Sequence, residues 1–359
     1  MRRAKKYFLA ISMMMALFLL PGCSKETQSY SHTDFAMGTV TNMTLYGNNT
    51  DLEKKEQQIV KKMKELETEQ ISWRVKSSAL AKLNQQLQEQ KGKAEVSEPL
   101  KGWLLEALKI GRDSYFDGRN TVDPSIGALT GLWNFESENL DSEHPEVPRA
   151  SKIKQAIRGL SENGSNITIK KDGTLLAKNT DTQFDLGAYG KGIGIDEAKK
   201  LLEKDSNISG AMVALGGSIL VYGEKPDGEA WNVGIQSPSG KDGEVLGALK
   251  VNGGASISTS GDYEKYFTDP ETGKRYFHIL DSKTGYSVET EIVSCTIVCD
   301  SGIDSDGLST ACFALGVQNS QKLLKKYDAK AIFVDKSKRV YVSEGLDFTL
   351  RDDQYKLDT

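Results

Sequence analysis

Histidine, cysteine and long apolar runs are scarce in this chain of 359 residues. It contains three histidines and four cysteines, and the cysteines beyond Cys23 are Cys295, Cys299 and Cys312. Three thiols cannot all pair within one chain, and such sparse cysteine excludes a disulfide scaffold. Cys295 and Cys299 lie in an alternating, strand-like pattern, which favours burial of these thiols over metal binding.

The one strongly apolar run covers residues 7–20 and is too short for a comfortable membrane span. Four basic residues precede it, which is typical of an export signal. The sequence LPGC, ending at Cys23, resembles a bacterial lipobox, in which the cysteine becomes the lipidated first residue. We therefore expect a signal peptide over 1–22 and a lipid anchor at Cys23, on the outward face of the cell membrane. A plain signal peptide cleaved nearby is the alternative.

Excess positive charge is absent as well. The formal net charge is −4, and loss of residues 1–22 would remove four positive and no negative side chains, leaving −8. An acidic domain is not expected to bind nucleic acid. A ligand that carries phosphate would need a local cation, such as a bound divalent metal, to offset the repulsion.

Beyond the signal, the composition predicts a polar tether over 23–33 and one domain over 34–359. His32 in the tether and His144 in an acidic loop are expected to have no chemical role. Helices are expected at 51–69, 98–115, 149–159, 195–204 and 307–327, and strands or hairpins at 35–47, 167–179, 211–222, 231–236, 246–259, 291–299 and 330–342. Helices and strands interleave without a regular βαβ repeat, so the predicted class is α+β, with mixed or antiparallel sheets flanked by helices.

One candidate site is the segment SDGLSTACFALG, residues 305–316. A helix beginning near Asp306 would place Asp306, Ser309 and Thr310 on one face of its first turn. Oxygen ligands of this kind suit Mg²⁺ or Ca²⁺. The alternative is that Asp306 only caps the helix, which is a common use of aspartate at this position.

A second candidate is the glycine-rich segment FDLGAYGKGIGIDEA, residues 184–198. Its glycines allow the backbone to approach a ligand closely before a helix begins. Lys191 could meet a phosphate and Asp185 could accept hydrogen bonds from a ring or ribose. The alternative is that the glycines only allow tight helix packing. Trp133 and Phe135 also have two interpretations, since they could stack on a planar ligand or fill the core.

Seven ordered segments together resemble the ApbE family, the FAD:protein FMN transferases. They are AMGT at 36–39, DPSIGALTGLWNF at 123–135, DLGAYGKGIGID at 185–196, ALGGSI at 214–219, ISTSGDYEKYF at 257–267, HILDSKTG at 278–285 and DGLSTACFALG at 306–316. The resemblance implies an α+β enzyme that cleaves FAD at its diphosphate, releases AMP and joins FMN to a Thr or Ser hydroxyl of an acceptor protein. An exported acceptor would match the expected anchor.

The resemblance also implies site residues. It assigns Mg²⁺ to the Ala188 carbonyl, Asp306 and Thr310, with Ser309 at a neighbouring ligand position. FAD contacts would come from Met37, Trp73, Thr121, Val122, Asp123, Asp185, Lys191 and Ile279. Trp73 stands where the family often has tyrosine. The family's acceptor signature resembles Asp-Gly-x-Ser/Thr-x-Ala-Thr, and DGLSTAC at 306–312 ends in Cys312 where the hydroxyl is required, so it is not a self-modification site.

His278 aligns with the family's histidine near the diphosphate. An imidazole titrating near neutrality can take a proton from a hydroxyl, so we expect His278 to be the general base. Two alternative functions remain open, namely a pyrophosphatase that hydrolyses FAD to FMN and AMP, and a flavin-binding lipoprotein without turnover.

Overall fold

A computed structural model describes residues 27–135, 137–140, 142, 144–161, 164–238 and 243–358. Cys23 and the expected signal peptide lie outside these residues. Within the described ranges, no helix combines the length and apolar composition needed to cross a membrane.

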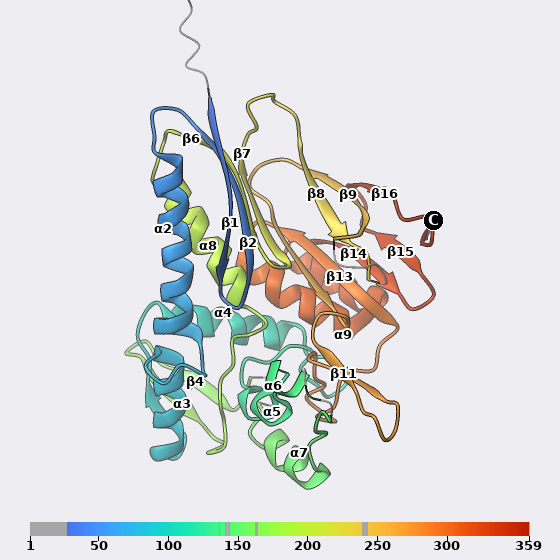
Figure 1. Ribbon diagram of the computed structural model, residues 1–359. Coiled ribbons are helices and arrows are strands. Elements are labelled where there is room, and N and C mark those ends of the chain that lie inside the picture. Colours follow the sequence, from blue (N-terminus) through green and yellow to red (C-terminus); the bar gives the residue numbers. More distant parts are fainter. Residues whose placement is uncertain are drawn as a thin grey trace, which may run out of the picture.

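A nine-stranded sheet forms the centre of the molecule (Figure 1). In spatial order its strands are β1 (Gln28–Ala36), β2 (Thr39–Gly47), β6 (Ile208–Leu215), β7 (Ser218–Gly223), β10 (Ser256–Gly261), β13 (Ile292–Cys299), β14 (Lys330–Asp335), β15 (Arg339–Val342) and β17 (Lys356–Leu357). All neighbours pair antiparallel except β15 and β17, which pair parallel.

Three smaller sheets surround the large one. They are formed by β16 (Asp347–Leu350) with β9 (Val245–Val251) and β8 (Trp231–Gln236), by β3 (Lys93–Glu95) with β5 (Thr174–Ala177) and β4 (Ile167–Ile169), and by β11 (Tyr266–Thr268) with β12 (Arg275–Phe277). In β8 the side chains of Trp231, Val233 and Ile235 are buried and alternate with exposed ones, as expected for a strand with one face on a core.

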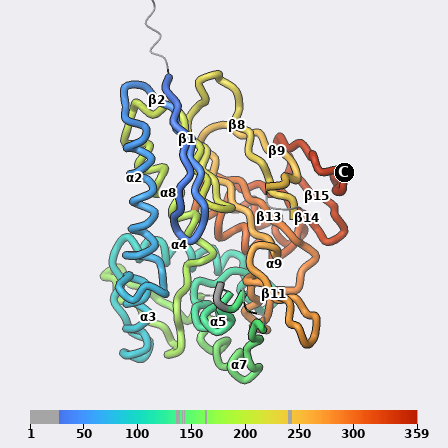
Figure 2. Tube along the Cα trace, in the orientation of Figure 1, coloured from blue at the N-terminus to red at the C-terminus, as the bar shows by residue number. Residues whose placement is uncertain are grey.

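The helices in the described ranges are α2 (Leu52–Glu65), the π-helix η2 (Leu66–Ile71), α3 (Ala79–Glu89), α4 (Leu100–Asp113), α5 (Gly127–Trp133), α6 (Ser137–Leu140), α7 (Ala150–Ile157), α8 (Gly190–Glu203) and α9 (Gly302–Lys326). The tube view draws α2 and α8 beside the β1–β2 hairpin (Figure 2). Apolar residues of these helices share a core with β2 and β6, including Ile59, Met63, Ile195 and Leu202.

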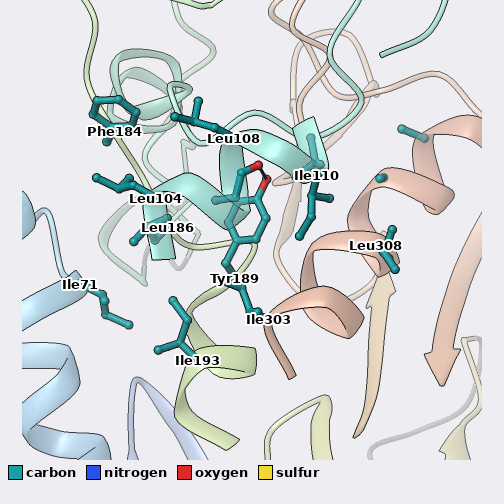
Figure 3. Close-up of a cluster of buried hydrophobic side chains, with 14 of the residues drawn as sticks. Ile71, Leu104, Leu108, Ile110, Phe184, Leu186, Tyr189, Ile193, Ile303 and Leu308 are labelled. Carbon is teal, nitrogen blue, oxygen red and sulfur yellow. Dashed lines mark hydrogen bonds between the residues drawn. The ribbon is translucent and has the colours of Figure 1, made fainter. Parts of the chain in front are cut away.

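A larger core joins α3, α4, α8 and α9. Figure 3 shows Tyr189, directly before α8, among Leu104, Leu108 and Ile110 of α4. The Tyr189 hydroxyl donates to the Ala107 carbonyl oxygen at 3.3 Å. The start of α8 is therefore anchored in the core, which fixes the position of the residues that follow it.

The mixture of helices and largely antiparallel sheets confirms the α+β prediction. Several boundaries were predicted wrongly. The runs 211–222 and 246–259 are each two strands, because glycine-containing turns interrupt them. Residues 28–33 of the predicted tether lie in β1, where they pair with β2. The charged helix expected at 51–69 ends as an α-helix at Glu65 and continues as η2.

Candidate active site

A cavity of about 240 Å³ collects segments that lie far apart in the sequence. Its walls come from the loop before α5, the start of α8, the end of β10, the segment after β12 and the second turn of α9. The predicted site residues that line it are Thr121, Val122, Asp123, Asp185, Ala188, Lys191, His278, Ile279, Asp306 and Thr310. A larger groove of about 490 Å³, lined by α3, α5 and α7, contains none of them, so the smaller cavity is the candidate site.

Asp306 is held at the point where α8 and α9 meet. The residue is 3% exposed, and its carboxylate accepts hydrogen bonds from the Gly192 backbone N–H at 2.9 Å and the Ser218 hydroxyl at 3.3 Å. Lys191 Nζ lies 3.7 Å from Asp306 Oδ1. The Asp306 carboxylate raises the pKa of Lys191, and Glu264 adds to this, so the lysine stays charged in spite of its burial. The predicted helix start at Asp306 was wrong, because Ser301 caps α9 and Asp306 lies one turn further in.

Three oxygen groups in this region fit a divalent cation. The Ala188 carbonyl lies just before α8, whose first helical hydrogen bond is accepted by Tyr189, and no donor to the Ala188 carbonyl is found within the described ranges. Thr310 presents a hydroxyl on the same cavity wall, 3.3 Å from the Ser260 hydroxyl. Carboxylate, carbonyl and hydroxyl oxygens are the donors that Mg²⁺ accepts in proteins. These residues therefore suit the predicted metal chemically.

His278 follows β12 and borders the cavity. Ser287 fixes the strand before it, because its hydroxyl accepts from the Phe277 N–H and donates to the Phe277 carbonyl, both at 2.7 Å. The His278 N–H donates to the Lys265 carbonyl at 3.1 Å. The ring is half-buried, and its Nδ1 is sealed from solvent with no partner in the described part of the chain.

The expectation that His278 titrates near neutrality was wrong for the free protein. Burial lowers the pKa of His278 to about 4, and the positive charges of Lys191 and Lys265 contribute. The imidazole is therefore neutral at physiological pH and can accept a proton. An anionic ligand beside Lys191 would offset the cationic charge and raise this pKa again.

The two aspartates predicted to contact FAD are organised by local hydrogen bonds. Asp123 is 4% exposed and accepts from both the N–H and the hydroxyl of Ser125, at 2.8 and 2.6 Å, and from Asn120 at 2.6 Å. Burial raises the pKa of Asp123. Asp185 accepts from the Thr130 hydroxyl at 2.7 Å and from the Gly187 N–H at 2.8 Å. Both carboxylates thus fix the backbone around the cavity.

Residues 37–333, well over half of the chain, match the model of the ApbE family. The chain belongs to the ApbE family.

Known ApbE proteins are similar over most of their length. The chain is 27% identical over 338 residues to the FAD:protein FMN transferase of Haemophilus influenzae, covering 93% of this chain and 94% of the relative. It is 32% identical over 280 residues to the enzyme of the same name from Treponema pallidum, covering 75% and 74%. The crystal structure of the ApbE protein from Thermotoga maritima superposes with a TM-score of 0.76 at 26% identity, covering 88% and 97%.

Three residues assigned from the ApbE resemblance do not line the cavity. Ser309 is fully buried, bonded to Ser260 at 2.7 Å and donating to the Asp306 carbonyl at 2.8 Å. Trp73 lies beneath the Arg74 guanidinium, 4.2 Å from its ring centroid. Met37 occupies the β1–β2 turn with φ 52°, and its side chain approaches Gly194 at the start of α8.

Trp133 belongs to the core, so the stacking alternative is wrong for it. It is fully buried among Phe135, Phe267 and Tyr276, and its indole N–H donates to the Gly285 carbonyl at 2.7 Å. This bond ties α5 to the loop that follows His278. Phe135 packs in the same cluster and also borders the cavity.

Glu264 is a cavity residue that the sequence reasoning missed. Its carboxyl pKa is raised by burial and by Asp306, while Lys191 opposes the shift. The side chain retains accessible surface, so it stands at the mouth of the cavity. It belongs to the matched segment ISTSGDYEKYF, residues 257–267, in which no single residue was singled out.

Gly192 shows that the glycines of α8 serve both packing and the site. A Cβ at Gly192 would lie 2.1 Å from the Gly302 carbonyl oxygen, so α8 and α9 cross here in direct backbone contact. Its N–H also binds Asp306. The tight helix packing proposed for these glycines is therefore present at Gly192, while close approach of the backbone to a ligand stays a prediction.

We expect Gly192→Ala to lower the free energy of unfolding by about 1–3 kcal/mol, because the added methyl must separate two backbones. Chemical denaturation measures this. Gly102→Ala is the matched control, since the nearest atom there is the flexible Glu98 carboxylate at 3.1 Å in an exposed part of α4. Equal stability of the two variants would contradict the close crossing.

Proposed function

We propose that this chain is a FAD:protein FMN transferase that moves FMN from FAD to a Thr or Ser hydroxyl of an acceptor protein and releases AMP. Support comes from the relatives that carry this name and from one observation in this chain. A single cavity contains a cation for phosphate, Lys191, a buried carboxylate, Asp306, and a neutral imidazole, His278.

In the proposed reaction, the acceptor hydroxyl oxygen bonds to the phosphorus on the flavin side of FAD. The bond from that phosphorus to the bridging oxygen breaks, and AMP leaves with the bridging oxygen. The hydroxyl proton passes to His278 at Nε2, since Nδ1 is sealed from solvent. A hydroxyl is a poor nucleophile at neutral pH, so removal of this proton is the main contribution of the imidazole.

The negative charge of the FAD diphosphate is a second obstacle to the reaction, after deprotonation of the hydroxyl. Lys191 faces the cavity as a point charge, and Asp306, the Ala188 carbonyl and Thr310 would hold Mg²⁺ there. The bound ion would neutralise charge that develops on the phosphate oxygens. Thr121, Val122 and Ile279 would line the remainder of the FAD site, where apolar contact orients a planar ligand.

We also propose that the enzyme is attached to the outer face of the cell membrane through a lipid on Cys23. The acceptor would then be another exported or surface protein. The basis is the order of basic residues, apolar run and LPGC in the first 23 residues.

The proposed activity predicts a covalent product. Incubation of the full chain with FAD, Mg²⁺ and an exported protein that carries the signature Asp-Gly-x-Ser/Thr-x-Ala-Thr should yield a fluorescent acceptor band that survives denaturation. Replacing the final threonine of that signature by alanine should abolish the band. AMP formed without acceptor would indicate hydrolysis instead, and FAD capture without AMP would indicate a binding protein; both would contradict the proposal.

A further inference from the structure

A second group of metal-ligand side chains lies away from the cavity, between β1 and α2. His32 and Asp34 alternate along β1 and so project to one side of the strand, while Glu56 comes from α2. His32 Nδ1 lies 3.3 Å from Glu56 Oε1, and one ligand atom from each of the three residues lies within 4.8 Å of the others. Both ribbon and tube views draw β1 alongside α2 (Figures 1 and 2).

Glu56 is the unusual member of this group. Its side chain is 2% exposed, whereas the His32 side chain is 48% exposed. The single hydrogen bond found for the Glu56 carboxylate within the described ranges is the one to His32. Burial of a carboxylate is unfavourable unless it is paired or coordinates a metal, and one bond at 3.3 Å leaves most of its hydrogen-bonding capacity unused.

We propose that His32, Asp34 and Glu56 bind a divalent transition-metal ion of the zinc type. One imidazole nitrogen and two carboxylates are a ligand set that zinc accepts, with water at the fourth position. Ligands at about 2.0–2.1 Å from a tetrahedral ion lie about 3.3 Å apart, which is the observed separation of His32 and Glu56. Asp34 places a carboxylate oxygen within 4.8 Å of the other two ligand atoms, and rotation of its partly exposed side chain would bring that oxygen closer.

The contacts of Asp34 partly favour and partly oppose its binding of a cation. Its Oδ1 accepts from the Phe35 N–H and from Lys64 Nζ at 3.1 Å, and these contacts lower the pKa of its carboxyl. Its Oδ2 has no hydrogen bond within the described ranges. Lys64 is half-exposed, so it can move away, but while it remains it competes with a cation for Asp34.

The ion would join the first strand of the domain to α2. β1 is an edge strand, and it directly follows the segment expected to lead to the lipid anchor. None of the three ligands lines the active-site cavity. The proposal is therefore independent of flavin transfer, and it assigns His32 a role that the sequence alone did not suggest.

Equilibrium dialysis of the EDTA-treated full chain against Zn²⁺, with the thermal midpoint recorded in parallel, tests the site. The wild-type chain should bind Zn²⁺ with a raised midpoint, and one equivalent should remain in Asp306→Asn, which removes the carboxylate of the ion site proposed in the cavity. His32→Ala and Glu56→Gln should weaken this binding by at least about tenfold, a loss seen even for indirect changes at metal sites. Lys64→Gln should tighten it, because the competing cation is gone.

Two matched variants separate this site from others. His144→Ala removes an exposed histidine elsewhere and should leave zinc binding unchanged, and Asp306→Asn should retain the Zn²⁺ bound through His32 because Asp306 belongs to the cavity. Co²⁺ substitution should give visible absorption bands that His32→Ala removes. Zinc binding that His32→Ala does not weaken, no binding by the wild-type chain, or loss only in Asp306→Asn would each overturn the proposal.

Discussion

Replacement of His278 by alanine should leave FAD binding intact and reduce FMN transfer by about 10²–10⁴-fold, the usual contribution of a positioned general base. The side chain borders the cavity, and its Nδ1 has no hydrogen-bond partner within the described ranges, so its removal breaks no hydrogen bond at that atom. Flavin fluorescence titration measures binding, and the rate of covalent label on the acceptor measures transfer. His144→Ala is the matched control.

The pH dependence gives a sharper test of His278. Its pKa in the free protein is about 4, below the ordinary 6.5, so its acid limb in kcat/KM should fall near pH 4. In the pH profile of kcat, the acid limb should lie at a higher pH, because the bound diphosphate offsets the lysine charges.

The lowered pKa of His278 also makes stability depend on pH. Between pH 4 and 6.5 the histidine is protonated in the unfolded chain but not in the folded one, so the free energy of unfolding rises with pH. His278→Gln should lose that part of the slope. An unchanged transfer rate in His278→Ala would exclude it as the base.

Neutralisation of Asp306 is the second change with a large expected effect. Asp306→Asn keeps the shape of the side chain and an acceptor for the Gly192 N–H, but it removes the only carboxylate of the proposed ion site. Loss of a metal's charge stabilisation amounts to several kcal/mol, so the transfer rate should fall at least about 10²-fold. The Mg²⁺ concentration needed for half-maximal rate should rise.

Asp304→Asn provides the control for Asp306. Asp304 lies two residues earlier on α9, is partly buried and does not line the cavity. Burial raises the pKa of Asp304 to about 6, so its neutralisation changes charge in the same helix without touching the proposed ion site. A Mg²⁺ titration that Asp304→Asn and Asp306→Asn shift equally would remove Asp306 from the metal site.

Local sequence patterns predicted much of the fold because they report local physics. The alternation in β8 gave its bounds correctly, and the aliphatic spacing in α4 and α9 identified both helices. The predicted helix start at Asp306 was wrong because the start depends on which residue acts as the N-cap. Here the N-cap is Ser301, whose hydroxyl accepts from the Asp304 N–H. A second serine and a glycine before Asp306 gave no clear indication of which residue would cap.

The site itself needed long-range contacts that no local pattern contains. Asp306 is held by Gly192, which is 114 positions away, and the pKa of His278 depends on burial and on Lys191. Most residues assigned from the ordered motifs line the cavity, but the motifs could not separate these from residues that do not line it. Ser309 is the example, since its position in the motif resembles that of Thr310 although it is fully buried.

The central claim is that one cavity couples cleavage of the FAD diphosphate to attack by an acceptor hydroxyl. The most direct measurement is a time course in which AMP and protein-bound FMN are quantified in the same samples, with and without acceptor. We predict equal molar amounts of the two products at every time and neither product when acceptor is withheld. AMP accumulating ahead of covalent FMN, or at the same rate without acceptor, would contradict the account.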